Sequence, residues 1–472
     1  MRSVTWLHFS DIHLCSPKSG WEYKRIIEKF KEDLQSLREE HGLIPDMIFF
    51  TGDAAFGQLG DGAGKPISEQ FDESEEVFSA IRETYYPPIP KACFFIVPGN
   101  HDVNIAKVNE NTDNGFGGSL KGLSHEEIKR TLENLMHENK IGWHDFSRRL
   151  EDFNRFLQAQ GYIYDNFDKD RLIWSHTCVI KGVKVGIAGM NSAWSYNKKI
   201  PKLFMAGHYQ AQSLLNNIGD AHIKVALMHH DTKGLIDAEA TSFERELEEN
   251  FDFFLHGHEH DAWVSEKADG HAKIASGALY DSSSKESGYN IVRLDLTTMT
   301  GKVWLRKYFP KGGGWGKEVV PNHAPDGIWS LKKLSDRVTV PAGSDTPEPA
   351  VDAVASAYTS AVPLASANSQ EARGVFGRAG IISELSGLLR KKQVMALYGL
   401  SGIGKSVLVK EVHKASAYSG HEYVKFHVSP DTDLDSRKGT KRTCPPPRHA
   451  AAHKGRERGQ RGTGSHSKAY AA

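Results

Sequence analysis

Five short segments of the sequence combine aspartate, asparagine and histidine, whose side chains bind divalent metal ions. The segments are Asp11-Ile12-His13, Gly52-Asp53, Gly99-Asn100-His101-Asp102, His229-His230 and Gly257-His258-Glu259-His260. Because they are rich in histidine and contain no thiolate, Mn, Fe, Zn or Ni suits them better than Ca, and an all-magnesium site is disfavoured. Two such ions, about 3.5 to 4 Å apart and bridged by one carboxylate, can clamp the attacking and leaving oxygens of a phosphoryl displacement.

Each segment follows a short apolar run that is typical of a buried strand. The expected strands span residues 4–9, 47–50, 93–97, 183–188, 224–228 and 251–255. Amphipathic stretches alternate with them: residues 21–41 form a helical pattern that should end at Gly42, and Ser124 with Glu127 makes a capping box. This alternation predicts an α/β fold, in which polar loops at the carboxyl ends of the strands meet at one crevice.

The order and wording of the five segments closely resemble the calcineurin-like metallophosphoesterase superfamily, whose pattern runs DxH, GDxx, GNH[DE], a His block and GHxH. All five blocks occur in that order between residues 8 and 260. One block alone occurs by chance often, but five ordered blocks at strand ends argue against chance. The resemblance implies a metallophosphoesterase β-sandwich flanked by helices. The departures are small: Asp231 stands where the family often has proline after His-His, and Ala54-Ala55 follow Gly52-Asp53.

The resemblance also implies a role for each donor. Asp53 would bridge two metal ions. His101 would face the substrate and stabilise or protonate the leaving oxygen, and Asp102 would orient the His101 imidazole. The remaining ligands would be Asp11, His13 and His260 for the first metal, and Asn100, His229 and His258 for the second.

The choice of His229 over His230 rests on the resemblance, and His229 is preferred because it adjoins the expected strand. Other histidines lie in polar or helical contexts, where solvation is the ordinary state. We therefore expect no site role for a group that includes His125, His137, His144, His222 and His271, and we assign none to His176 or His208.

A second motif, GLSGIGKS at residues 399–406, satisfies GxxxxGK[ST] between an expected strand at 394–398 and a helix. In that context the backbone of Gly399 to Gly404 would cradle the phosphates of ATP, Lys405 would reach the β- and γ-phosphates, and Ser406 would ligate Mg²⁺. With Phe376-Gly377-Arg378 upstream, the motif is similar to the signal-transduction ATPases with numerous domains (STAND). No acidic strand end of the Walker B kind follows before residue 436, so the segment lacks a sequence signal for ATP hydrolysis.

Composition divides the chain into four parts. We expect a phosphoesterase domain at 1–310, an Ala/Ser/Pro-rich linker at 311–370, a truncated P-loop NTPase segment with a partial α/β pattern at 371–430, and a low-complexity basic tail at 431–472. From residue 436 onward there is no Val, Ile, Leu, Met, Phe or Trp, so the tail should be disordered. An interrupted reading of a longer protein explains this tail better than the alternative, a basic arm for nucleic acid.

The zero net charge of the 472 residues hides an asymmetry, because ten Lys/Arg after residue 436 leave residues 1–435 with a formal charge of −9. Such a body argues weakly against non-specific binding of nucleic acid. No run approaches the ~18 apolar residues of a membrane-spanning helix. The four cysteines (Cys15, Cys93, Cys178 and Cys444) lack the spacing of a disulfide framework or a zinc site. We therefore expect a cytoplasmic protein with no membrane partner.

The leading hypothesis is a two-metal phosphoester hydrolase that acts as the effector domain of a STAND-type protein, with self-association through the NTPase in full-length relatives. The alternative is a nucleotide-binding signalling or scaffold protein whose phosphoesterase fold is catalytically silent. Phosphodiesters, including nucleic acids and cyclic nucleotides, are slightly favoured as substrates over phosphomonoesters. The Asn/Gly-rich stretch at 109–122 is an insertion that either lines the crevice or forms a mobile surface loop.

Overall fold

The computed structural model describes residues 2–15, 18–20, 22–59, 64–137, 140–280, 287–331 and Val338, and these residues form two seven-stranded sheets. In the first sheet the order is β13-β12-β11-β1-β2-β3, and β14 pairs with β12. Strands β1, β2 and β3 are parallel, whereas β1 and β11 are antiparallel. The bounds are β1 Ser3–Phe9, β2 Met47–Phe50, β3 Phe94–Ile96, β11 Ser287–Asp295, β12 Thr300–Phe309, β13 Gly314–Lys317 and β14 Ile328–Leu331.

The second sheet has the order β4-β5-β6-β7-β8-β10-β9. Its centre is parallel from β6 through β7 and β8 to β10, and its two edges are antiparallel. The bounds are β4 Asn166–Asp168, β5 Ile173–Ile180, β6 Val183–Gly189, β7 Ile223–Leu227, β8 Phe253–His256, β9 Ala262–Glu266 and β10 Ala272–Ser276.

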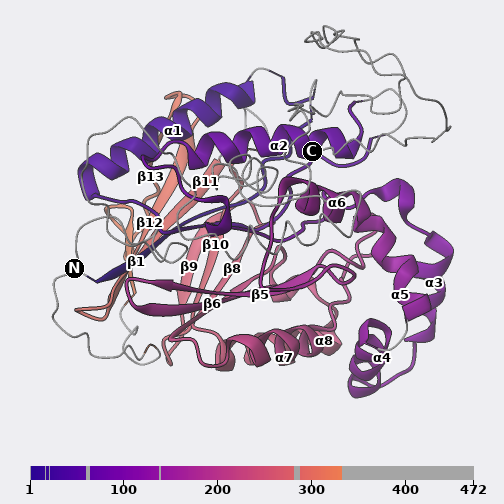
Figure 1. Cartoon of the computed structure of the whole chain (residues 1–472). Helices are drawn as coiled ribbons and strands as arrows, with labels where there is room; N and C mark the ends of the chain where they lie inside the picture. The colour runs from indigo at the N-terminus through magenta and orange to yellow at the C-terminus, as the bar shows by residue number, and fades with distance from the viewer. Residues whose placement is uncertain are drawn as a thin grey trace, which may run out of the picture. The chain divides into compact units, whose positions relative to one another are not determined.

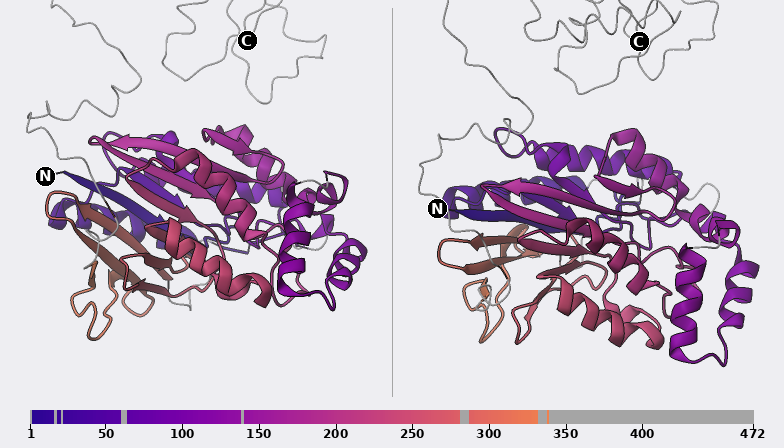
Figure 2. Two further views of the ribbon diagram at one scale, coloured as in Figure 1. Left: turned by 90° about the horizontal axis from the view of Figure 1, so that it is seen from below. Right: turned by 60° about the horizontal axis from the view of Figure 1, so that its bottom comes forward.

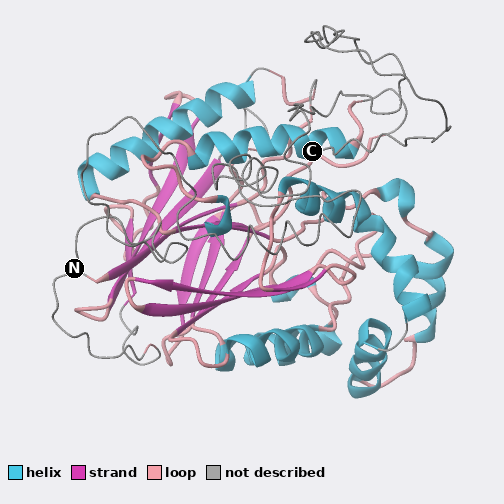
Figure 3. Cartoon of the chain, in the orientation of Figure 1, coloured by secondary structure: helices cyan, strands magenta, loops and turns pink. Residues whose placement is uncertain are grey.

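Helices cover the outer faces of the two sheets, as the ribbon views show (Figures 1 and 2). Helices α1 and α2 lie over the first sheet, α7 and α8 lie over the second, and α3, α4 and α5 gather at one end (Figure 3). None of the described helices combines the length and the hydropathy that a bilayer crossing requires. The bounds are α1 Glu22–His41, α2 Ile67–Arg82, α3 Glu110–Ser119, α4 His125–His137, α5 Lys140–Ser147, α6 Glu151–Gln160, α7 Gly207–Ile218 and α8 Asp237–Asn250.

Large aromatic side chains fill the space between the two sheets. Trp6 of β1 meets Phe253 of β8 edge to face, with ring centroids 5.1 Å apart. Phe95 of β3 stacks on Trp174 of β5 at 5.8 Å. Each of these side chains is buried, and full burial of such a residue contributes about 1.5 to 3 kcal/mol to folding. This apolar interior holds the parallel strands of both sheets in fixed positions, and hence the loops that follow them.

The structure confirms the expected α/β sandwich flanked by helices. It also confirms the expected end of α1 and the expected capping box of α4. Helix α1 buries Ile26, Phe30 and Leu34 on one face, and Gly42 follows it with φ 62°. The capping box at the start of α4 is also present, because Glu127 Oε2 accepts hydrogen bonds from the backbone N and the Oγ of Ser124.

Two parts of the fold differ from the expectation. Strands β13 and β14 pair with β12, so the first sheet continues to Leu331, beyond the domain end expected at residue 310. The Asn/Gly-rich insertion is not a loop throughout, because most of it forms helix α3, whose N-cap Asn109 accepts hydrogen bonds from two backbone N–H groups. Apart from Val338, the remaining linker, the P-loop segment and the basic tail lie outside the described residues.

Candidate metal centre

All five candidate metal-binding segments lie at the carboxyl ends of parallel strands, namely β1, β2, β3, β7 and β8. Backbone hydrogen bonds join the segments to one another. The amide of Asp11 donates to the carbonyl of Gly52 at 3.0 Å, and the amide of Gly257 donates to the carbonyl of His229 at 3.0 Å. Residues that are distant in sequence therefore meet at one edge, which is the arrangement expected from the strand pattern.

A first group of donors surrounds the carboxylate of Asp11. The Nε2 atoms of His13 and His260 both lie 3.4 Å from Asp11 Oδ1. This oxygen is buried. A buried carboxylate oxygen that two imidazole nitrogens face fits a set of metal ligands.

A second group of donors surrounds His229. Its Nε2 lies 3.0 Å from Asn100 Oδ1 and 3.3 Å from Asp53 Oδ2. Its Nδ1 donates to the carbonyl of Thr51 at 2.7 Å, which fixes the ring and leaves Nε2 to face the two oxygens. Two side-chain oxygens and one imidazole nitrogen thus converge, as they would around a cation.

Asp53 belongs to both groups. Its Oδ2 lies 3.3 Å from Nε2 of His13 in the first group and 3.3 Å from Nε2 of His229 in the second. Potential metal ligands from both groups come within 4.8 Å of one another around this carboxylate. One oxygen shared in this way has the position that a bridging ligand requires.

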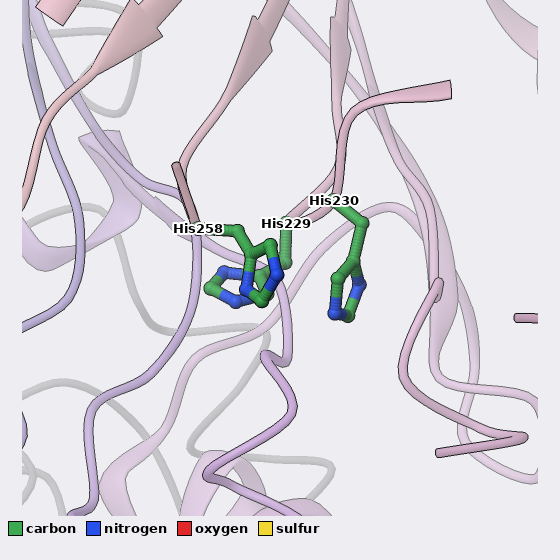
Figure 4. A group of neighbouring side chains, drawn as sticks. All are labelled: His229, His230 and His258. Carbon is green, nitrogen blue, oxygen red and sulfur yellow. The ribbon is translucent and has the colours of Figure 1, made fainter. Parts of the chain in front are cut away.

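His230, which sequence reasoning ranked below His229, also lies at the second group. His229, His230 and His258 place donor atoms within 4.8 Å of one another, and Figure 4 shows their three imidazoles side by side on two loops. However, Nδ1 of His230 is 2.8 Å from Ser192 Oγ, whereas His229 contacts Asn100 and Asp53. These contacts favour His229 as the residue that shares the bridging carboxylate.

The charges of the centre suit a cation. Burial disfavours the ionised form of Asp53, but the imidazoles of His229 and His101 outweigh it and hold the carboxyl pKa well below its usual range. Burial likewise opposes protonation of His229, and yet the carboxylates of Asp53 and Asp11 raise its pKa to about 9. The carboxylates that raise the pKa of His229 also favour divalent ions.

Several donors have an unusual backbone conformation. Asp11, His13, Asp53, His258 and His260 all have positive φ angles, between 45° and 68°. For residues other than glycine this left-handed region costs of order 1 to 3 kcal/mol, and such residues cluster at functional sites. The strained turns direct side chains from successive positions towards the same point.

The glycine before each of two donor segments allows the backbones to come close. A Cβ on Gly99 would clash with Oδ1 and the backbone nitrogen of Asp53. A Cβ on Gly257 would lie 2.7 Å from Asp11 Oδ2 and closer still to Ser10 Oγ. The glycines in these motifs are therefore required by packing around the carboxylates.

We expect Gly99→Ala to weaken metal binding by about 10- to 100-fold, because the added methyl group must displace the Asp53 carboxylate. Equilibrium dialysis with Mn²⁺ measures the change. Gly118→Ala is the matched control, since a Cβ at Gly118 in α3 meets nothing within 4 Å and should leave metal binding unchanged. Equal affinity in Gly99→Ala and the wild type would contradict the packing argument.

His101 lies beside the donor groups with its ring held from one side. Its Nδ1 donates to the carbonyl of Phe56 at 2.6 Å, and its backbone N–H donates to Asp53 Oδ1 at 2.7 Å. The ring stacks on His13 with centroids 4.5 Å apart. The Nε2 atom is thereby left as the position from which this imidazole can exchange a proton.

Asp102 makes no contact that would orient His101 among the hydrogen bonds of the described residues, although the family resemblance implied that role. Both oxygens of this fully buried carboxylate instead accept backbone hydrogen bonds: Oδ2 from Asp53 and Gly99, and Oδ1 from Ala55. Burial and the nearby charge of Asp53 raise its pKa to about 7. Asp102 therefore fixes the turns that carry Asp53 and Asn100, while the Phe56 carbonyl orients His101.

Tyr196 lies at the centre but belongs to none of the sequence motifs, so the sequence did not predict its role. The hydroxyl of Tyr196 is hydrogen-bonded by the side chain of Asn100, and partial burial followed by the charge of Asp53 raises its pKa. Its backbone is held by the buried Arg149, whose Nη1 donates to the Tyr196 carbonyl at 2.9 Å while Nη2 pairs with Asp113 of α3 at 2.6 Å. Helix α3 thus supports one wall of the centre.

The remaining histidines mostly stay outside the site, with one correction. His271, expected to be solvated, is 1 % exposed, and its Nδ1 donates to the carbonyl of Phe251 at 2.7 Å. It begins the turn into β10, so the apolar strand carries it inward despite its polar neighbours. Gly399, Gly404, Lys405 and Ser406 of the second motif lie outside the described residues.

Comparison with protein families gives two matches. The model of the calcineurin-like phosphoesterases matches residues 4–262, more than half of the chain. A second model, novel STAND NTPase 6, matches residues 375–437, which include the P-loop motif. Both resemblances found in the sequence are thus confirmed. No curated protein matches the sequence.

Solved structures match the chain at low sequence identity. GAP50, the anchor in the inner membrane complex of Plasmodium, is 12% identical, with 71% of this chain and 93% of that chain covered and a TM-score of 0.36. A dimetal phosphatase from Danio rerio is 11% identical, with 70% and 99% covered and a TM-score of 0.37. A 5'-nucleotidase from Candida albicans is 10% identical, with 62% and 48% covered and a TM-score of 0.31.

Proposed function

Because the chain belongs to the calcineurin-like phosphoesterase family and is thereby a metal-dependent phosphoester hydrolase, we propose that it cleaves phosphodiesters at a two-metal centre. The observation that carries this proposal is the position of Asp53 Oδ2, 3.3 Å from an imidazole nitrogen of each donor group. The first metal would be held by Asp11, His13 and His260, and the second by Asn100, His229 and His258, with Asp53 between them. Mn, Fe, Zn and Ni suit this set of oxygen and nitrogen donors.

When bound, the two ions supply Lewis-acid chemistry at the phosphoryl group. The protein orients the reaction with its own groups. His101 Nε2 would give a proton to the leaving oxygen, since Phe56 holds Nδ1 and the stacked His13 ring holds the plane of the imidazole. Tyr196 would position the amide of Asn100 so that Oδ1 faces His229.

We favour a monoanionic diester over a dianionic monoester as the substrate, and the state of Arg149 is consistent with this choice. The cation behind the Tyr196 wall, Arg149, is fully buried, paired with Asp113 and hydrogen-bonded to a backbone carbonyl. It therefore offers no positive charge to a second phosphate oxygen. Candidate substrates are nucleic acids and cyclic nucleotides.

Parallel assays with Mn²⁺ on a chromogenic diester and the matching monoester test the substrate class. We expect kcat/KM to be at least about tenfold higher for the diester, a barrier difference of about 1.4 kcal/mol. Single-stranded DNA, duplex DNA and cyclic nucleotides are then compared, with His101→Ala as the control for contaminating activity. A faster monoester reaction would refute the diester assignment.

We further propose that the phosphoesterase is the effector of a STAND-type switch. The match of the STAND model to residues 375–437 supports a nucleotide-binding segment after the hydrolase. In longer relatives of this arrangement, self-association through the NTPase would bring the hydrolase domains together.

Lys405→Ala should abolish ATP binding and leave diester hydrolysis within twofold of the wild type, because Lys405 supplies the ammonium of the phosphate loop. Fluorescence of a labelled ATP analogue measures binding. Lys410→Ala is the control, as this lysine lies outside the motif. Loss of hydrolysis in metal-loaded Lys405→Ala would show that the two parts are coupled in this chain.

The boundary of the hydrolase can be tested by truncation. Residues 1–345 should fold and retain hydrolysis, whereas residues 1–310 should lose much of their stability, because Trp315 of β13 packs against Phe30 and Tyr289 with ring centroids 5.7 and 5.1 Å apart. Thermal unfolding and diester turnover of both chains provide the measurement. Equal melting temperatures would mean that β13 and β14 are dispensable.

A further inference from the structure

A separate group of possible metal ligands lies next to the two-metal centre. Asp231 follows β7, His256 is the last residue of β8, and Glu259 lies in the loop after β8. Their donor atoms all lie within 4.8 Å of one another. Asp231 and His256 are buried, whereas Glu259 is exposed. None of the three is among the seven donors assigned to the catalytic metals.

Two buried atoms of this group have no hydrogen-bond partner in the described part of the chain: His256 Nε2 and Asp231 Oδ2. The Nδ1 of His256 lies 3.1 Å from the carbonyl of Gly257, so Nδ1 carries the proton and Nε2 keeps its lone pair. The imidazole is thus in the form that binds a metal, with its other nitrogen fixed by a backbone carbonyl.

The Oδ1 oxygen of Asp231 already has hydrogen-bond partners. Its Oδ1 accepts from the buried ammonium of Lys273 and from the hydroxyl of Thr232 at 2.9 Å. Among the described residues, the exposed ammonium of Lys233 lies 3.8 Å from Oδ2. Lys273 therefore orients the carboxylate through one oxygen and leaves the other to a second partner. A buried carboxylate oxygen without such a partner is costly.

We propose that Asp231, His256 and Glu259 form an accessory site for a divalent transition-metal ion of the Zn²⁺ or Mn²⁺ type. One imidazole and two carboxylates suit these ions better than Ca²⁺ or Mg²⁺. The exposed Glu259 provides the entry from solvent. An ion here ties the loop after β7 to the loop after β8, which carry His229 and His258, without replacing any of their catalytic contacts.

Trp263 provides a local reporter. Its Nε1 donates to Glu259 Oε2 at 2.8 Å, and its ring centroid lies 5.2 Å from that of His256. A paramagnetic ion at the accessory site is in contact range of this indole and should quench its fluorescence.

The experiment compares metal content by elemental analysis after Zn²⁺ dialysis of the full chain. We expect about three equivalents in the wild type and about two in Glu259→Gln and His256→Gln, with diester hydrolysis within about twofold of the wild type. Asp261→Asn is the matched control, because this exposed neighbour belongs to no donor group, and it should keep the wild-type content. Glu259 is exposed, so its variant remains informative even where His256→Gln fails to fold.

A Co²⁺ titration followed by tryptophan fluorescence separates the accessory site from the catalytic one. Saturable quenching should persist in Asp53→Asn, which removes the bridging carboxylate, and should disappear in Glu259→Gln. Wild-type protein that binds no more than two equivalents, or Glu259→Gln that keeps the third equivalent and the quenching, would overturn the accessory site. Wild-type protein that binds the accessory ion but lacks the catalytic metals would instead contradict the proposed two-metal centre.

Discussion

Asp53→Asn should abolish phosphoesterase turnover and reduce bound divalent metal to a small fraction of the catalytic complement. The reason is that one oxygen of Asp53 contacts His13 and His229 at 3.3 Å each, so a single substitution removes a ligand from both groups. The amide is nearly isosteric with the carboxylate but carries no charge, and its NH₂ group cannot bind a metal. Elemental analysis and diester turnover on the same preparation give the measurement.

Asp220→Asn is the matched control, because Asp220 is an exposed aspartate that forms an ion pair with Lys184. It should retain both metal and activity. An Asp53→Asn protein that keeps two ions and measurable turnover would show that Asp53 does not bridge the groups, and the ligand sets would then have to be redrawn around Asp11.

The second large effect is expected from His101→Ala, which should keep its metals but lose about 10² to 10⁴ in kcat, the usual contribution of a general acid. The assignment makes a sharper prediction about leaving groups. A diester that releases a nitrophenolate needs little protonation, whereas one that releases an alkoxide needs it fully. The loss should therefore be much larger for the alkyl leaving group.

His125→Ala, at the exposed start of α4, controls for the loss of an imidazole. Equal losses for both leaving groups would mean that His101 positions the substrate and does not act as an acid. Metal loss equal to that of Asp53→Asn would mean that His101 is a ligand.

The positions of the donors could be predicted because each follows an apolar run that the fold buries as a strand. Buried apolar residues precede the donors, such as Phe49 and Phe50 before Asp53 and Phe254 and Leu255 before the GHEH segment. Such runs strongly favour a buried strand. Parallel strands then bring their carboxyl ends to one edge. The chemistry of the centre follows from the local sequence to this extent.

The residues that hold the metal-binding side chains in place could not be predicted, because they act through contacts between residues distant in sequence. The sequence of α3 contains three glycines and has poor helix propensity, yet the helix is fixed by its Asn109 cap and by the pair between Asp113 and Arg149, 36 residues apart. The family resemblance implied that Asp102 orients His101, but its buried carboxylate is occupied by three backbone amides. No local pattern reveals that Tyr196 reaches Asn100.

The pairing of β1 with β11 sets the order in which the nascent chain can fold. Strand β1 is made first, but one of its edges stays open until residues 287–295 have been synthesised, roughly 15 to 60 s later at ordinary elongation rates. The amides of Leu279 and Tyr280, which donate to the carbonyls of Ser10 and Asp11, arrive at almost the same time. The seven proposed metal ligands would therefore all have left the ribosome before the loop around Asp11 acquires these backbone partners.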